Sequence, residues 1–131
     1  MGESIFCRNT WSKMATIRIT DLRLRAIIGV NDWERKHKQD VVINVMMEFD
    51  AQKACASDSI QDTVDYKTIT KRIIKAVEAS DYLLLEKLAA AILDIVMEDH
   101  KVTGATVRVD KPFALRFADS VSIELSKKRN P

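Results

Sequence analysis

The sequence predicts an α+β fold, a four-stranded antiparallel sheet with two helices on one face. Four segments alternate apolar and polar residues, which is the period of a strand with one buried face. Between the second and third of these strands, two segments carry apolar residues at the spacing of an amphipathic helix. The predicted order is therefore strand, strand, helix, helix, strand, strand, and both helices can cover the same face of the sheet.

The first two strands should form an antiparallel hairpin. The first covers about residues 16–28, and its apolar positions change phase near residues 20–21, which indicates a β-bulge. Gly29 ends this strand, and residues 30–39 form a polar loop. The second strand covers about residues 40–50, where apolar side chains alternate along one face.

The two helices follow an irregular segment at residues 51–62. Asp65 can cap a first helix that starts near Tyr66, because its side-chain oxygen can accept from the free N–H groups of a helix start. A second helix covers about residues 84–97. The first helix should bury a stripe of residues spaced by four, namely Ile69, Ile73 and Val77.

The last two strands cover about residues 102–110 and 119–126. Pro112 has no backbone N–H to donate, so it should stop the third strand. Lys111 therefore sits at the end of a rigid element, where a proton-transfer group is held most firmly.

Size and charge indicate one domain. At 131 residues with a net charge of +2, the chain lacks the basic surface expected of a nucleic-acid-binding protein. Residues 1–14 are predicted to be a disordered N-terminal extension, with Met14 as an alternative start. Residues 15–128 form the single domain and residues 129–131 a tail. No apolar run approaches the length of a membrane span.

The cysteines and histidines give no metal-binding pattern. Cys7 and Cys55 form no Cys-x-x-Cys pair, which favours reduced thiols in a cytosolic protein. His37 and His100 have no partner at metal-ligand spacing, and the glycines form no phosphate-binding loop. A Gly-x-Ser-x-Gly elbow is also absent from the sequence, so we expect any catalysis here to proceed without a metal, a nucleotide loop or a serine nucleophile. We expect no cofactor.

The predicted sheet has two long edges, which natural proteins usually pair or protect. Its face away from the helices mixes polar and charged side chains, among them Arg18, Asn44, Arg108 and Ser122. Pairing of the edges between subunits would form a ring and would explain both features. The alternative is a monomer with one hydrated sheet face, which is common for antiparallel sheets.

Four polar residues near the ends of predicted elements are candidates for chemistry: Glu34, Tyr66, Glu86 and Lys111. Taken alone, Glu34 and Lys111 are typical surface charges, and Tyr66 is a typical half-buried aromatic residue. Glu86 alone is typical of a solvated first turn, where a negative charge is favourable. Only their combination points to a function.

Five stretches of the sequence carry a family resemblance: IGVNDWE (28–34), QDVVINV (39–45), DTVDY (62–66), LLEKLA (84–89) and VDKP (109–112). In this order they resemble the dihydroneopterin aldolase family and the closely related dihydroneopterin triphosphate epimerases. The resemblance implies the T-fold (tunnelling fold), in which sheets of several subunits join into an intersubunit β-barrel. It further implies a cytoplasmic homo-octamer of two tetrameric rings, with sites between neighbouring subunits.

The resemblance also implies how a pterin is held. Glu86 would accept the pterin 2-amino group and the adjacent ring N–H through two charge-assisted bonds. The main chain of Leu85 would bind the same ring, and the main chain of Val64 would hold its far edge from the neighbouring subunit. The ring of Tyr66 would lie against the pterin, and its hydroxyl would assist protonation.

The implied chemistry uses Lys111 as the principal acid–base residue, acting through a water, while Glu34 orients the hydroxyls of the substrate. Removal of the 2′-hydroxyl proton allows the C1′–C2′ bond to break, because the ring C=N accepts the electrons. Glycolaldehyde leaves, and protonation of C1′ gives 6-hydroxymethyl-7,8-dihydropterin. Addition of glycolaldehyde to the other face inverts C2′ instead.

Our first choice from the sequence is an aldolase of folate biosynthesis, a lyase, because the segments carrying Glu34 and Tyr66 look like that branch. The alternative is the triphosphate 2′-epimerase. It is favoured by ALRFADSV at residues 114–121 and by the stretch with Arg23 and Arg25. Arg116 in that segment is a candidate phosphate partner or a structural arginine.

Two other classes of protein are also consistent with the sequence. One is a ring-forming pterin-binding scaffold that has lost catalysis, and direct pterin turnover would separate it from the enzymes. The other is a different purine- or pterin-binding enzyme of the same fold, which would usually add metal ligands.

Overall fold

The structure is a computed structural model that describes residues 12–130. Most of the predicted N-terminal extension, including Cys7, lies outside the described residues. The predicted sheet is confirmed, with four antiparallel strands in the order β1-β2-β3-β4. The strands are β1 (Met14–Ala26), β2 (Gln39–Asp50), β3 (Val102–Pro112) and β4 (Ser120–Lys128).

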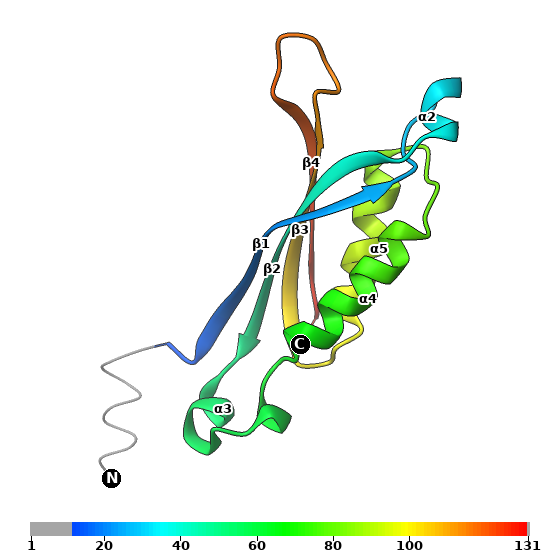
Figure 1. The fold of residues 1–131 in the computed structure, drawn as a ribbon. Coiled ribbons are helices and arrows are strands. Elements are labelled where there is room, and N and C mark those ends of the chain that lie inside the picture. The colour runs from blue at the N-terminus through cyan, green and yellow to red at the C-terminus, as the bar shows by residue number, and fades with distance from the viewer. Residues whose placement is uncertain (1–11, 131) are drawn as a thin grey trace.

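Two long helices cover one face of this sheet, as Figure 1 shows. They are α4 (Tyr66–Glu78) and α5 (Leu85–Met97), close to the predicted positions. Asp65 caps α4 as predicted, because its Oδ1 accepts from the backbone N–H of Thr68 at 3.2 Å. The same bond is the main reason that the pKa of Asp65 lies below its ordinary value.

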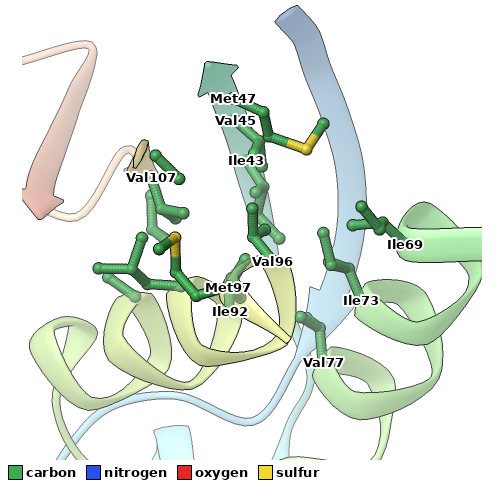
Figure 2. Packing of buried hydrophobic residues seen from close by; sticks show 14 of the residues in the cluster. Ile43, Val45, Met47, Ile69, Ile73, Val77, Ile92, Val96, Met97 and Val107 are labelled. Carbon is green, nitrogen blue, oxygen red and sulfur yellow. The ribbon is translucent and has the colours of Figure 1, made fainter. Parts of the chain in front are cut away.

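A single apolar core fills the space between the helices and the sheet (Figure 2). The predicted stripe of α4 is confirmed, since Ile69, Ile73 and Val77 are each at most 4% exposed. Burial of such a side chain stabilises the fold by roughly 1.5–3 kcal/mol. This core therefore fixes β3 and the two long helices, at whose ends Lys111, Tyr66 and Glu86 lie.

The predicted bulge in β1 is confirmed. The pairing with β2 shifts between Ile19 and Leu22, where β1 contains one extra residue. Asp21 takes a left-handed φ of 52°, and its backbone N–H donates to Oδ1 of Asn44 at 2.9 Å. A bulge bends a strand and increases its twist. Beyond this point β1 and β2 turn together toward α2 (Asp32–Lys36), as Figure 1 shows.

Two segments predicted to lack regular structure contain short helices, and the prediction is wrong there. The polar loop holds α2, and the segment at residues 51–62 holds α3 (Gln52–Ser57) and the 3₁₀ helix η1 (Ile60–Asp62). None of the three has a buried residue, so no periodic apolar pattern marks them. The ends of the strands differ from prediction by about two residues, which is usual for element boundaries.

Arg129, which the sequence places in the tail, is bonded to the domain. Its Nη2 donates to the carbonyl oxygen of Met97 at 2.6 Å, and its Nε donates to that of Val102 at 3.1 Å. The guanidinium thus binds one carbonyl at the end of α5, where helix carbonyls lack intrahelical partners, and one at the start of β3.

The face of the sheet away from the helices is open. Arg18, Asn44 and Arg108 lie on this face and border a hollow of about 240 Å³. Within residues 12–130, β1 and β4 each pair on one side only, so the sheet is not closed. Cys55 is exposed and carries a free thiol. No helix in the described part of the chain is long and apolar enough to cross a membrane.

Candidate active site

Glu34 is held at the start of α2 by reciprocal hydrogen bonds. Its backbone N–H donates to Oδ1 of Asn31 at 2.9 Å, and its Oε1 accepts from the backbone N–H of Asn31 at 3.4 Å. This capping box satisfies two of the free N–H groups of the helix start. The position of the Glu34 carboxylate is therefore set by its own segment of chain.

Gly29 leaves the space that this carboxylate occupies. It has a φ of +127°, and a Cβ at this position would lie 2.2 Å from Cδ of Glu34. Glycine adopts such a φ at little cost, whereas other residues rarely do. Gln39 also contacts the carboxylate, because its Nε2 donates to Oε2 of Glu34 at 3.2 Å and to the carbonyl of Ile28 at 2.9 Å.

Lys111, which lies near the end of β3 and 77 positions after Glu34 in the sequence, also contacts the Glu34 carboxylate. Its ammonium donates to Oε2 of Glu34, and both side chains are only 13% exposed. Lys111 shares the helix-covered side of β3 with Val107 and Val109, which are fully buried. The bond from Lys111 is the main reason that the pKa of Glu34 lies below its ordinary 4.5. Desolvation acts in the opposite direction, and Gln39 adds a smaller lowering.

A carboxylate and an ammonium placed in this way offer a substrate hydroxyl both an acceptor and a donor. The low exposure strengthens these bonds relative to bulk water. The pair is thus suited to moving a proton to or from a hydroxyl. Within residues 12–130 no group of three or more His, Cys, Asp or Glu side chains is arranged to hold a metal ion.

Arg35 connects the loop that carries α2 to the chain just before α5. Its Nη2 donates to the carbonyl of Asp81 at 2.6 Å, and its Nη1 donates to that of Tyr82 at 3.2 Å. The start of α5, with Leu85 and the exposed Glu86, therefore lies at the same end of the molecule as α2 (Figure 1).

Tyr66 and Val64 lie at the other end. Tyr66 opens α4 and is 51% exposed, and its hydroxyl has no hydrogen-bond partner among the described residues. Val64 is almost fully buried. Because α4 and α5 run in opposite directions, their first residues are at opposite ends of the helical layer (Figure 1). A single chain therefore brings Glu34 to Lys111 but does not bring Tyr66 to either.

Three residues that build the site were not predicted from the sequence: Gly29, which leaves space for the Glu34 carboxylate, Asn31, which caps α2, and Gln39, which donates to the carboxylate. A detectable signal existed for Asn31, since Asn-x-x-Glu is the spacing of a capping box. Nothing in the sequence marks Gln39, because its role depends on a contact with a loop whose conformation the sequence does not reveal.

The fold and the site define a small α+β domain with a shielded acid–base pair at the end of a sheet whose edges are unpaired. The chain belongs to the dihydroneopterin aldolase family, whose model matches residues 17–126. The family resemblance proposed from the five sequence stretches is thereby confirmed.

Three relatives illustrate the similarity. The chain is 50% identical to the dihydroneopterin triphosphate 2′-epimerase of Escherichia coli K12, over 88% of this chain and 96% of that protein. It is 30% identical to the dihydroneopterin aldolase of Haemophilus influenzae, over 84% and 93%. Among solved structures, E. coli dihydroneopterin aldolase in complex with neopterin superimposes with a TM-score of 0.82 at 26% identity, over 86% and 98%.

Proposed function

We propose that this protein is a dihydroneopterin triphosphate 2′-epimerase. The observation that carries the proposal is the 50% identity along nearly the whole length of the E. coli epimerase, against 30% for the H. influenzae aldolase. Our first choice from the sequence was the aldolase, and these identities favour the alternative. Both activities belong to the same family and begin with the same bond cleavage.

The acid–base pair supports this chemistry. The substrate 2′-hydroxyl would bond to the carboxylate of Glu34, and Lys111, through a water, would relay the proton taken from that hydroxyl. The C1′–C2′ bond then breaks, and its electrons move into the ring C=N to give an enamine. A positioned acid–base group typically contributes about 10²–10⁴-fold to the rate of such a step.

In the epimerase the aldehyde fragment stays bound. It carries C2′, C3′ and the triphosphate, and it presents its other face to C1′. Attack by the enamine restores the C1′–C2′ bond and the ring C=N, and the new 2′-oxygen takes back the proton. Atoms and charge are conserved, and only the configuration at C2′ changes.

The pterin ring would be held by the residues that the family resemblance implies. The exposed carboxylate of Glu86 would accept the 2-amino group and the ring N–H, beside the main chain of Leu85. Charge-assisted bonds of this kind contribute about 1.5–3 kcal/mol each. Tyr66 and the main chain of Val64 would come from a neighbouring subunit, because they lie far from Lys111 in their own chain.

The shared site requires an oligomer. The edges of β1 and β4 are unpaired within the described residues, and joining them between subunits would close a barrel. We propose a tetrameric ring, and two stacked rings as an octamer. Light scattering should show a stable oligomer at micromolar concentration, and a monomer that is active would contradict a site built from two chains.

The second candidate is the aldolase. It is supported by the similarity to the aldolase solved with neopterin, and by the aldolase-like segments around Glu34 and Tyr66. The two enzymes differ in the fate of the enamine, since an aldolase protonates C1′ and releases the aldehyde. The epimerase and the aldolase can therefore be distinguished by whether the aldehyde fragment stays bound or is released.

The test is incubation with 7,8-dihydroneopterin triphosphate and, separately, with 7,8-dihydroneopterin, with chromatographic separation of the products. We expect rapid inversion at C2′ of the triphosphate with little aldehyde released. Rapid release of glycolaldehyde from dihydroneopterin, with a slow reaction of the triphosphate, would establish the aldolase. No turnover of either compound would favour the scaffold. Parallel reactions with EDTA should retain full activity.

A further inference from the structure

The sheet splits at the end that carries Lys111. The pairing of β2 with β3 stops at Val42 and Asp110. The pairing of β3 with β4 continues to Pro112, and the pairing of β1 with β2 continues to Gln39. In Figure 1, β1 and β2 accordingly curve toward α2, whereas β3 and β4 continue to the loop between them.

A hollow of about 240 Å³ lies where the strands separate. Residues 40–42 of β2 border it on one side, and Pro112 and Phe113 border it on the other. Pro112 directly follows Lys111 in the chain. Lys111 and Glu34 do not line the hollow themselves, and Pro112 is the link between the hollow and Lys111. The hollow opens toward the uncovered face of the sheet, where the side chains of Arg23 and Arg25 lie.

Two arginines of β1, Arg23 and Arg25, line the same hollow. Arg25 is already engaged, since its Nε lies 3.4 Å from Oδ1 of Asp40 and its Nη2 donates to the carbonyl of Lys38 at 2.9 Å. Arg23 is exposed and has no ion-pair or hydrogen-bond partner among residues 12–130. The hollow therefore contains one guanidinium whose donors are available to a ligand.

We infer that this hollow holds the polyphosphate of the substrate and that Arg23 is its guanidinium contact. The inference rests on the proposed function, in which C2′ reacts beside Lys111. The phosphate chain begins two bonds beyond C2′, at the 3′-oxygen, so its first phosphate must lie close to Lys111. Arg23 pairs with Val42, and Val42 pairs with Asp110, the residue before Lys111, so the backbone of Arg23 is two strand spacings, about 9.5 Å, from that of Asp110. An arginine side chain and a chain of phosphates together span that gap.

The chemistry of the groups fits this ligand. A guanidinium offers paired donors that match two phosphate oxygens, and the resulting bonds are charge-assisted. Such a contact would also explain how the aldehyde fragment stays bound after the C1′–C2′ bond breaks, because its triphosphate remains anchored. Arg23 is therefore a specificity residue and takes no part in proton transfer.

The test compares Arg23→Gln with Arg18→Gln, a matched control on the same strand and the same face. We expect Arg23→Gln to raise KM for dihydroneopterin triphosphate about tenfold or more, the effect of one lost charge-assisted contact. The kcat, and turnover of unphosphorylated dihydroneopterin, should change little. Arg18→Gln should leave all of these values unchanged. An unchanged KM in Arg23→Gln, or an equal loss with both substrates, would overturn the inference.

A second measurement separates this inference from the proposed function. Inorganic tripolyphosphate should bind the wild-type protein in calorimetry and should bind Arg23→Gln much more weakly. If the wild type epimerises the triphosphate but tripolyphosphate binding is the same in Arg23→Gln, the function stands and the assignment of Arg23 falls. Loss of binding in Arg116→Gln instead would place the phosphates on the loop after β3. If no epimerisation occurs, Arg23-dependent tripolyphosphate binding would still support the anion site.

Discussion

At one end of the sheet, Glu34 has three hydrogen-bond partners within its own chain, namely Asn31, Gln39 and Lys111. At the other end, Tyr66 is half exposed, and its hydroxyl has no partner in the described part of the chain. The carboxylate at the first end is thus positioned by its own chain, whereas the hydroxyl at the second end is not. This difference supports the proposal that one chain supplies the acid–base pair and a second chain completes the binding of the pterin.

The largest effect on activity should come from a change at the end of the sheet that carries Glu34 and Lys111, which we call the organised end. Lys111→Ala should lower kcat about a hundredfold or more, the usual contribution of an acid–base group, while the pterin still binds. Steady-state kinetics with the triphosphate measure the first effect, and fluorescence titration with neopterin measures the second. Lys101→Ala, which removes an exposed lysine just before β3, is the control. A loss of only a few-fold in Lys111→Ala would remove Lys111 from its assigned role.

The division between chains can be tested by mixing two variants. Lys111→Ala and Tyr66→Ala should each be nearly inactive as a homo-oligomer. A mixed oligomer contains some interfaces in which both residues are wild type, so activity should reappear when the two are refolded together. Mass spectrometry should verify that mixed oligomers form. Verified mixed oligomers without recovered activity would show that both residues act from one chain, and an active Tyr66→Ala homo-oligomer would show that Tyr66 is not needed.

Glu86→Ala should have the opposite signature to Lys111→Ala. Loss of a carboxylate that accepts two N–H groups should raise KM and the dissociation constant of neopterin about tenfold or more, with a much smaller change in kcat. Lys87→Ala alters the adjacent exposed residue and serves as the control. Equal loss of binding in Glu86→Ala and Lys111→Ala would contradict the separate roles assigned to them.

Gly29→Ala should disturb the organised end without removing any functional group. The new Cβ would lie 2.2 Å from Cδ of Glu34 at a φ of +127°. We expect a loss of about 1–3 kcal/mol in the free energy of unfolding, together with lower turnover. Gly104→Ala is the matched control, because its nearest contact would be an ordinary 3.4 Å. Chemical denaturation of both variants provides the measurement, and equal stabilities would contradict the packing described for Glu34.

The smallest effect is a pH dependence. Lys111 lowers the pKa of Glu34 in the folded protein below 4.5, so the ionised carboxylate adds stability above pH 4.5. This contribution is lost as the pH falls through the folded-state pKa. Wild type should therefore melt at a higher temperature than Glu34→Gln at neutral pH, and the difference should shrink in acid. A difference that stays constant with pH would mean that the Glu34 carboxylate is not stabilised by Lys111.

The sequence predicted the sheet and both long helices because their apolar positions repeat over many residues. The stripe Ile69, Ile73 and Val77 is an example, since each position is buried as its spacing requires. Helix α2 was missed because its five residues bury nothing, so only the Asn31 cap distinguishes it from a loop.

The contact between Glu34 and Lys111 was not predictable from local patterns. The two residues are separated by 77 positions, and each alone is a typical surface charge. The family resemblance predicted both as site residues. It did not predict that they bond to each other or that Gln39 donates to Glu34, and the structure provides these two contacts. The separation of Tyr66 from this pair likewise follows from the antiparallel course of the two helices.

Because of the bulge at Asp21, the direction of β1 depends on the number of residues between Ile19 and Leu22. Since the extra residue sits between Ile19 and Leu22, its removal would keep both side chains on the buried face of a regular strand. A three-nucleotide deletion there would thus preserve the core and straighten the strand that leads to Gly29. Substitutions at the bulge cannot produce this change, because they leave the residue count intact. The extra residue of the bulge therefore sets the direction in which the chain leaves β1 toward the loop that carries Glu34. When relatives are aligned, a gap at this position should be interpreted as a change in the direction of this strand.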